Sequence, residues 1–195
     1  MLGQNVSTID AILMTHEHRD HIAGLDDIRI YNYKRSAPLD IYCYKRVENH
    51  IRAAFAYIFD PNPYPGIPSV NFKTISDQSF LIGDLEIQPV KVLHYKLGVC
   101  GFRVGPLAYI TDVSEIPEES YRLLEGVDTV VLGALRKTAH ISHFSLDEAV
   151  EAARRIGARE SYFIHMSHDM GMHQEVQNEL PPNMYLSFDG LTLEF

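Results

Sequence analysis

The sequence lacks the features of membrane, secreted and thiolate-metal proteins. No apolar run approaches the roughly 18 to 20 residues that cross a bilayer, and the N-terminal stretch MLGQNVSTID has no basic region followed by an apolar one. Its only two cysteines, Cys43 and Cys100, lie far apart and have no CxxC spacing. We therefore expect a cytoplasmic protein in which both thiols are buried and reduced rather than joined in a disulfide.

Positive charge is also scarce. The chain has 17 basic and 26 acidic residues, which gives a formal net charge of −9. A chain of this charge repels nucleic acid backbones at long range, so binding to RNA or DNA is disfavoured. The small basic clusters are better explained as solvated surface than as phosphate sites: Arg29, Lys34 and Arg35; Lys45 and Arg46; Arg136 and Lys137.

The remaining composition is that of one soluble globular domain. Hydrophobic residues make up 46% of the 195 residues and charged residues 22%, so residues 1–195 are expected to bury a single core. The clearest helix spans Ser145 to Ile156, where Ser145 and Glu148 form a capping box and Gly157 ends the helix. Strands and helices alternate along the chain, which predicts an α/β fold rather than an all-β one.

The other expected elements follow from periodicity and from turn residues. Helical stretches are predicted at His21–Lys34 and Val47–Phe59, and a proline-rich loop at Asp60–Pro68. Strands are predicted at Ala11–Met14 (buried), Asp40–Tyr44, Leu85–Leu93, Val99–Val104, Leu107–Thr111, Asp128–Leu132, Ser161–Ile164, Met184–Phe188 and Leu191–Phe195.

Histidine is abundant, with ten in the chain, and four potential metal ligands follow the first strand. In an extended segment His16, His18 and Asp20 would point to the same side, because side chains alternate along a strand. A turn into a helix at His21 would give that imidazole a second direction. Imidazole and carboxylate ligands suit zinc, manganese or iron(II). This cluster predicts a metal site, because surface polarity alone does not explain such a density.

Three further candidate ligands stand where predicted strands end: His94, Asp112 and His165. Taken singly, each histidine is better explained as a hydrogen-bonded core or surface residue. Asp112 alone would be a cap for the turn at Ser114-Glu115. Ligands at strand ends along one edge of a sheet are held close together by a rigid scaffold. Beside the first cluster, this position favours metal binding for all three.

The residues that carry these groups resemble the motifs of a known superfamily. Thr15 to His21, followed by Ile22 to Arg29, is similar to the HxHxDH signature of the metallo-β-lactamase superfamily. The run Gly24-Leu25-Asp26-Asp27 resembles the branch of phosphoribosyl cyclic phosphodiesterases. His94, Tyr109–Asp112 and Ile164–His168 match the later motifs in order. The resemblance covers nearly the whole chain and implies an αββα sandwich.

The resemblance also implies a site for two divalent metal ions, zinc or manganese. His16, His18 and His94 would hold one ion, and Asp20, His21 and His165 the other, with Asp112 bridging them; Asp20 is therefore expected among the catalytic residues. A metal-bridging hydroxide would attack a small, cyclic phosphodiester. His143 would protonate the leaving oxygen, with His140 as its competitor for this role.

One departure from the superfamily pattern concerns the start of the chain. The HxHxDH motif begins at residue 16, whereas family members normally have paired strands before it. We therefore expect a truncated chain or a reduced first sheet, with an exposed edge that favours a homodimer. Three other functions remain open: a nuclease acting on RNA or DNA ends, a lactone or thioester hydrolase, and a non-catalytic metal-binding scaffold.

Overall fold

The computed structural model describes residues 6–62 and 64–194, so Pro63 of the predicted loop, Phe195 and residues 1–5 lie outside the described residues. The chain divides into two compact units, Met1–Ser76 and Asp77–Phe195, and each has its own sheet and hydrophobic core. Within the described ranges, no helix is long and apolar enough to span a bilayer.

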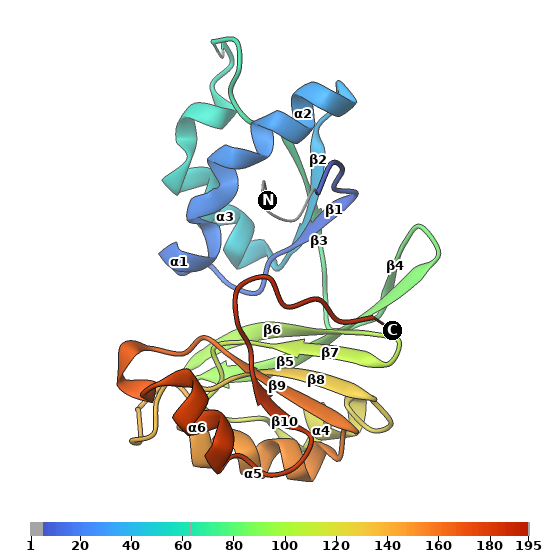
Figure 1. Cartoon of the computed structure of the whole chain (residues 1–195). Coiled ribbons are helices and arrows are strands. Elements are labelled where there is room, and N and C mark those ends of the chain that lie inside the picture. Colours follow the sequence, from blue (N-terminus) through green and yellow to red (C-terminus); the bar gives the residue numbers. More distant parts are fainter. Residues whose placement is uncertain (1–5, 63, 195) are drawn as a thin grey trace. The chain divides into compact units, whose positions relative to one another are not determined.

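The first unit is a three-stranded parallel sheet covered by helices. The strand order is β1 (Ala11–Leu13), β2 (Leu39–Cys43) and β3 (Val70–Thr74). Parallel neighbours need crossover connections, which are α1 (Arg19–Ile22), 3-10 helix η2 (Ala23–Ile28) and α2 (Arg29–Arg35), then α3 (Lys45–Ala54) and 3-10 helix η3 (Ala56–Phe59). The helices lie on one face of this sheet (Figure 1). Among the described residues, β1 pairs with β2 alone and forms an edge.

The core of the first unit follows from alternation along β2. Leu39, Ile41 and Cys43 are fully buried and alternate with half-buried residues. On the helical side they meet Val47 and Ile51 of α3, which are also fully buried. The apolar stripe of the helix thus covers the apolar face of the strand.

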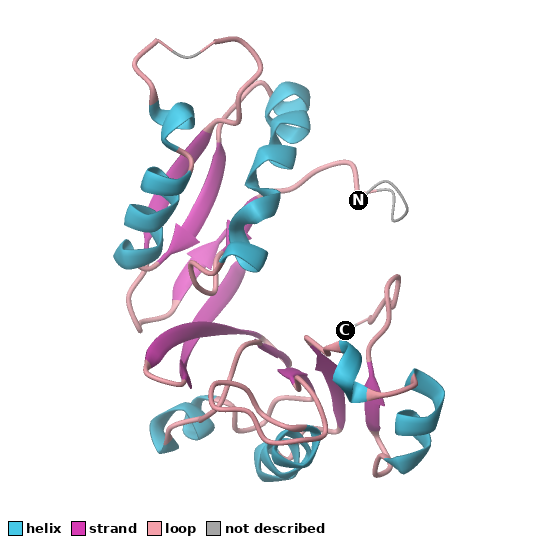
Figure 2. Cartoon of the chain, turned by 90° about the vertical axis from the view of Figure 1, so that its left-hand side faces the viewer, coloured by secondary structure: helices cyan, strands magenta, loops and turns pink. Residues whose placement is uncertain are grey.

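The second unit is a seven-stranded mixed sheet in the order β10-β9-β8-β7-β6-β5-β4. Figure 2 shows these strands in magenta, and Figure 1 shows the helices of this unit along one face of the sheet. The strands are β4 (Phe80–Ile82), β5 (Leu85–His94), β6 (Leu97–Val104), β7 (Leu107–Ile110), β8 (Thr129–Gly133), β9 (Glu160–Ile164) and β10 (Met184–Leu186). The helices are α4 (Glu118–Leu123), α5 (Leu146–Ile156), the 3-10 helix η4 (His168–Met170) and α6 (His173–Glu179).

Strand direction decides which residues share an edge of this sheet. β5 and β6 are antiparallel, β6 and β7 are antiparallel, and β7, β8 and β9 are parallel. β5, β7, β8 and β9 therefore run in the same direction, and their carboxyl ends lie at one edge. In open sheets, the carboxyl ends of parallel strands are where ligands bind.

Most predicted elements are confirmed, and the capped helix is the clearest case. Helix α5 begins after Ser145, whose side chain and Glu148 form both bonds of the capping box, and ends at Gly157 with φ of 74°. Both thiols are buried, as predicted, and among the described residues neither is joined in a disulfide.

Several predictions about the elements were wrong. The first helix begins at Arg19 rather than at His21. β1 is only half-buried, and Met14 beyond it is buried. Residues 191–194 form no strand. Helices α4 and α6 were not predicted. In α6 the apolar signal is weak, because the helix buries only Val176 and otherwise consists of polar residues.

Candidate metal centre

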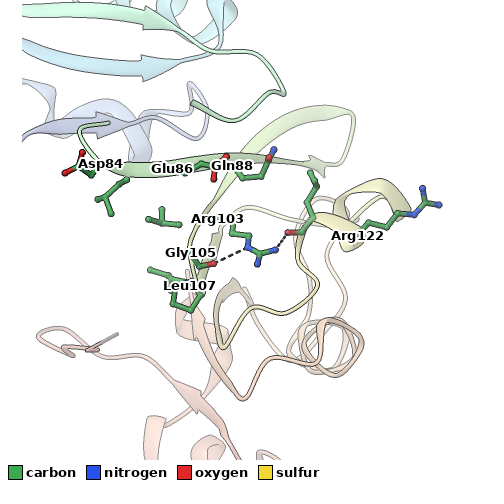
Figure 3. Close-up of a pocket in the computed structure, with 11 residues that line it drawn as sticks. Asp84, Glu86, Gln88, Arg103, Gly105, Leu107 and Arg122 are labelled. Atoms are coloured by element: carbon green, nitrogen blue, oxygen red, sulfur yellow. Dashed lines mark hydrogen bonds between the residues drawn. The ribbon is translucent and has the colours of Figure 1, made fainter. Parts of the chain in front are cut away.

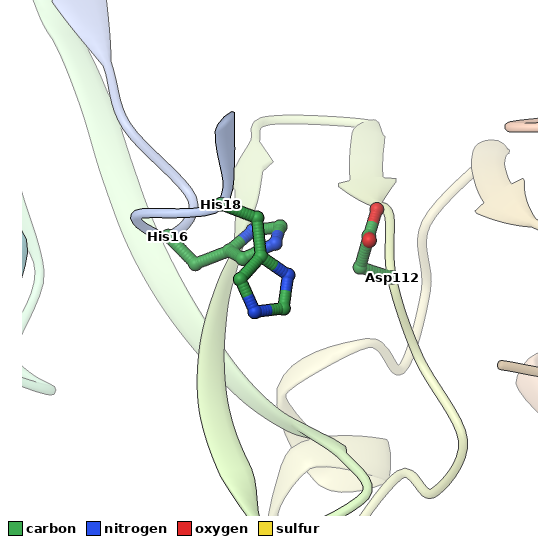
Figure 4. Close-up of side chains that lie close together, drawn as sticks. All are labelled: His16, His18 and Asp112. Atoms are coloured by element: carbon green, nitrogen blue, oxygen red, sulfur yellow. The ribbon is translucent and has the colours of Figure 1, made fainter. Parts of the chain in front are cut away.

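Three histidines of the first unit lie against one another directly after β1. The ring centroids of His16 and His18 are 4.5 Å apart in an edge-to-face arrangement, and those of His16 and His21 are 4.2 Å apart. Figure 4 shows His16 and His18 on the loop that leaves β1. His16 is fully buried, whereas His18 is exposed. The apolar strand thus ends in a cluster of imidazoles.

Asp20 joins this cluster by a different geometry from the one predicted. Because α1 already begins at Arg19, Asp20 lies in the first turn of a helix and not on an extended strand. Its carboxylate is 3.3 Å from Nε2 of His21, and 65% of its side chain is exposed. Asp20 therefore pairs with His21, and the expected alignment of His16, His18 and Asp20 on one side of an extended segment was wrong.

The second unit gathers its candidate ligands at the carboxyl edge of its sheet. His94 ends β5, Asp112 follows β7, and His165 follows β9. Nε2 of His165 lies 3.3 Å from Oδ1 of Asp112. The carboxyl group of Asp112 is almost fully buried and accepts a hydrogen bond of 2.7 Å from the hydroxyl of Thr111.

His143 lies among these three residues. Its ring centroid is 4.4 Å from that of His94 and 5.1 Å from that of His165, and its Nδ1 lies 3.9 Å from Oδ2 of Asp112. His94, Asp112 and His143 each offer a ligand atom within 4.8 Å of the others. The ring centroid of His140 lies 5.2 Å from that of His143, and its Nδ1 lies 3.3 Å from the amide nitrogen of Ser142. The geometry within this unit therefore favours His143 over His140.

The alternative explanation for Asp112 can be tested against its neighbours. The amides of Ser114 and Glu115 donate to the carbonyl oxygen of Leu93, at 2.7 and 3.2 Å. These bonds tie the segment after Asp112 to the end of β5. The amides of Ser114 and Glu115 thus have an acceptor in β5, and the turn does not depend on a cap by the carboxylate of Asp112.

Unusual backbone geometry accompanies two of the ligand positions. Asp112 has φ of 49° and His165 has φ of 62°, both in the left-handed region that residues with side chains rarely adopt. Such conformations cost about 1–3 kcal/mol and cluster at functional sites. The two carboxyl ends of β7 and β9 therefore turn sharply at the residues that are candidate ligands.

A hydrogen bond from a main-chain carbonyl fixes one of the candidate imidazoles. Nδ1 of His94 lies 2.6 Å from the carbonyl oxygen of Ser142. A bond of this kind sets the tautomer and the orientation of a histidine ring. Ser142 was not predicted, because a contact through the main chain carries no residue-type signal.

The surroundings of His143 change its protonation. Burial lowers the pKa of His143 to about 4; the neighbouring Asp112 opposes this shift, while His94, His165 and His140 add to it. The ring is therefore neutral near pH 7 in the free protein. An anionic substrate beside it would favour the charged form and raise the pKa again.

A pocket of about 660 Å³ lies at the other end of the strands of the second unit. Its lining includes the start of β5, the β6–β7 turn and Arg122 (Figure 3). The guanidinium of Arg103 donates to the carbonyl oxygens of Gly105, Leu123 and Glu125. The donors of Arg103 thus join the β6–β7 turn to the segment at the end of α4. No histidine is among the residues that line this pocket.

The donor set is suited to divalent metal ions. The two clusters contain imidazoles and carboxylates and no thiolate, because Cys43 and Cys100 lie in the cores. Such ligands bind zinc, manganese or iron(II) and leave positions for water and substrate. The residues present therefore fit the metal centre that the sequence predicts.

Comparison with known proteins identifies the family. The chain belongs to the beta-lactamase superfamily domain family, whose model matches residues 2–166. It has the metallo-β-lactamase fold, and its structure resembles that of a diphosphatase from the PhnP family. The sequence-based identification of superfamily and fold class is confirmed.

Three relatives show how far the similarity extends. The PhnP-family diphosphatase is 36% identical with a TM-score of 0.91, over 100% of this chain and 74% of the other. A metallo-beta-lactamase fold protein, YhfI from Bacillus subtilis, is 18% identical with a TM-score of 0.73, over 94% and 76%. An octanoyltransferase of Porphyromonas gingivalis is 35% identical over 192 residues; the match covers 97% of this chain but only 39% of that protein's length.

Proposed function

We propose that the protein is a metal-dependent phosphodiesterase that cleaves a small, cyclic phosphodiester. Two divalent ions, zinc or manganese, would be held as the family pattern implies. His16, His18 and His94 would bind one ion, and Asp20, His21 and His165 the other, with Asp112 as the bridge. The observation that carries the proposal is the buried carboxylate of Asp112, with His94, His143 and His165 around it at one sheet edge.

The chemistry asked of the metal ions is limited. When bound, they would supply an activated water as nucleophile and neutralise charge on the phosphoryl oxygens. The protein would contribute ligands in fixed orientations. The carbonyl of Ser142 holds the His94 ring, and the sharp turns at Asp112 and His165 aim their side chains. Groups held in this way need little reorganisation during the reaction.

His143 would handle the proton of the leaving group. Its imidazole lies beside Asp112, His94 and His165. His143 belongs to a loop rather than to the end of a strand, and this position would let its ring face a substrate. A bound phosphodiester would raise the pKa of the ring, and the protonated ring would then donate to the departing oxygen. General acid catalysis of this kind accelerates a reaction about 10²–10⁴-fold, and most when the leaving group is poor.

A second candidate reaction is hydrolysis of a diphosphate bond in a small molecule. It is favoured by the similarity to the PhnP-family diphosphatase, at 36% identity over the whole chain. The same attack at phosphorus would serve both reactions. Cleavage of RNA or DNA ends is less compatible with the net charge of −9. Thioester hydrolysis releases a thiolate, which is a good leaving group, and would make little use of such a proton donor.

A substrate panel distinguishes these reactions. Purified protein would be loaded with Zn²⁺ or Mn²⁺ and given bis(p-nitrophenyl) phosphate, cyclic ribose phosphates, a dinucleoside diphosphate, short RNA and a thioester. The proposal requires cyclic ribose phosphates to have the highest kcat/KM. The highest value for the diphosphate would establish the second candidate instead. Turnover of RNA or thioester alone would contradict both.

A further inference from the structure

A short loop of the second unit carries several groups of the candidate site. We define the histidine loop as residues 137–143, which form the middle of the connection between β8 and α5. It contains His140, His143 and the Ser142 carbonyl that accepts from His94. The loop has no regular secondary structure. Its conformation therefore depends on individual contacts.

Main-chain bonds fix both ends of this loop. The amide of Leu135 donates to the carbonyl of Phe144 at 2.9 Å, and the amide of Leu146 donates to the carbonyl of Arg136 at 2.8 Å. These bonds lie outside residues 137–143, which have no regular secondary structure. The base of the loop is thus rigid, and its middle needs another support.

The side chain of Arg136 provides that support. Its Nε donates to the carbonyl of Thr138 at 3.3 Å, and its Nη2 donates to the carbonyl of Ala139 at 2.9 Å. Its Nη1 lies 3.8 Å from Oδ2 of Asp169 in η4, a few residues after His165. The guanidinium thus joins the histidine loop to the segment that follows His165.

We infer that Arg136 is a positioning residue that holds the histidine loop, so that His143 and the Ser142 carbonyl keep the orientation used in hydrolysis. This inference rests on the proposed function for its effect on catalysis, but not for its effect on the loop. Arginine suits the role because its planar fork reaches two carbonyls and a carboxylate at once, which a lysine ammonium cannot reproduce. A displacement of about 1 Å at a reacting group can cost roughly 10²-fold in rate.

Neighbouring Lys137 is a matched control. It is the first residue of the histidine loop and carries the same charge as Arg136, but its Nζ pairs with Glu179 in α6 at 2.5 Å, and both side chains are about half exposed. Exposed ion pairs of this kind contribute little to stability. Lys137→Gln removes a cation of the loop without removing a donor to the loop carbonyls.

The test compares Arg136→Gln, Arg136→Lys, Asp169→Asn and Lys137→Gln with the wild type. Hydrogen exchange of peptides that cover residues 137–143, measured on metal-free protein, reports the loop itself. Turnover is measured on aryl phosphodiesters whose leaving group ranges from p-nitrophenol to phenol. We expect Arg136→Gln to speed exchange in the loop and to lower kcat about 10-fold or more for the phenyl ester, but less than about threefold for the p-nitrophenyl ester.

Arg136→Lys should show slower loop exchange and a smaller loss of kcat than Arg136→Gln. Asp169→Asn should speed loop exchange and lower kcat for the phenyl ester as Arg136→Gln does, but by a smaller factor. These two variants keep the test usable if Arg136→Gln does not fold. The inference would be overturned if Arg136→Gln and Lys137→Gln showed the same hydrogen exchange in the loop and the same dependence of kcat on the leaving group. A wild type that turns over no phosphodiester would instead contradict the proposed function, and loop exchange on the metal-free protein would still decide the role of Arg136.

Discussion

Gly133, the last residue of β8, lies against the main chain that presents Asp112. A Cβ atom at this position would lie 3.1 Å from the amide nitrogen of Asp112 and 3.5 Å from Cα and the carbonyl carbon of Thr111. All three of these atoms belong to the backbone, which moves less easily than a side chain. Gly133→Ala should therefore push Asp112, whose φ of 49° is already strained, by a few tenths of an ångström.

The size of the effect follows from two opposing contributions. Overpacking in a well-packed interior costs about 1–3 kcal/mol. Reduced chain entropy of the unfolded state offsets about 0.4–1 kcal/mol of this. We expect Gly133→Ala to lower the free energy of unfolding by about 1–2 kcal/mol. Metal affinity should fall about 10-fold, because disturbed support of a ligand typically costs roughly 10–100-fold.

Gly98→Ala in β6 is the matched control, because the nearest atom to its new Cβ is the flexible Cε of Lys91, at 3.5 Å. Urea unfolding of the metal-free variants gives the stability difference, and titration with Zn²⁺ gives the affinity. Gly98→Ala should stay within about 0.5 kcal/mol of the wild type. If Gly133→Ala matches this control in both measurements, the close approach of β8 to Asp112 does not position the carboxylate.

Three further predictions concern other residues. His143→Ala should retain its metal content, measured by elemental analysis, but lose about 10²-fold or more in turnover of poor leaving groups; unchanged rates would remove His143 from the mechanism. The side-chain nitrogens of Lys45 and Arg52 lie 2.8 Å from the carboxylate oxygens of Glu48 and lower the pKa of this buried group below its ordinary value of 4.5. The ionised carboxylate therefore stabilises the fold above pH 4.5. This stabilisation is lost as the pH falls through the lowered pKa. Glu48→Gln should thus lower the free energy of unfolding in urea at pH 7 by about 1–2 kcal/mol. Hydrogen bonds to charged groups contribute roughly 1.5–3 kcal/mol, and the exposure of both cations reduces this. A stability difference between variant and wild type that does not narrow at pH 3 would contradict the lowered pKa of Glu48. Burial, with the nearby Glu48, raises the pKa of the Cys43 thiol to about 12, so a thiol reagent at pH 8 should label it only in urea, and rapid labelling of the native protein would be inconsistent with the buried position.

The sequence predicts where the candidate ligands stand in the fold, because each of them lies where an apolar run stops. The strands before His16, His94, Asp112 and His165 were recognisable by their composition, and a polar residue of the right type follows or ends each one. Since parallel strands place their carboxyl ends at one edge, strand ends were a sound guide to the residues that gather in the second unit.

Other features of the site have no comparable signal in the sequence. The early start of α1 at Arg19 changes the direction of Asp20, because local polar residues are compatible with either a helix or an extended loop. The left-handed backbone of His165 and the carbonyl contact of Ser142 depend on the folded neighbourhood. Gly133 appeared only as the end of a strand, and its close approach to Asp112 requires coordinates to detect.

The most direct measurement for the proposed metal centre is metal content together with turnover. Protein dialysed against Zn²⁺ or Mn²⁺ and then freed of excess ion would be analysed for metal per chain and assayed with bis(p-nitrophenyl) phosphate, alongside Asp112→Asn. We predict two equivalents bound, with turnover, and a loss of both binding and turnover in the variant. Protein that retains less than one equivalent, or that binds two and hydrolyses no phosphodiester, would contradict a dinuclear phosphodiesterase.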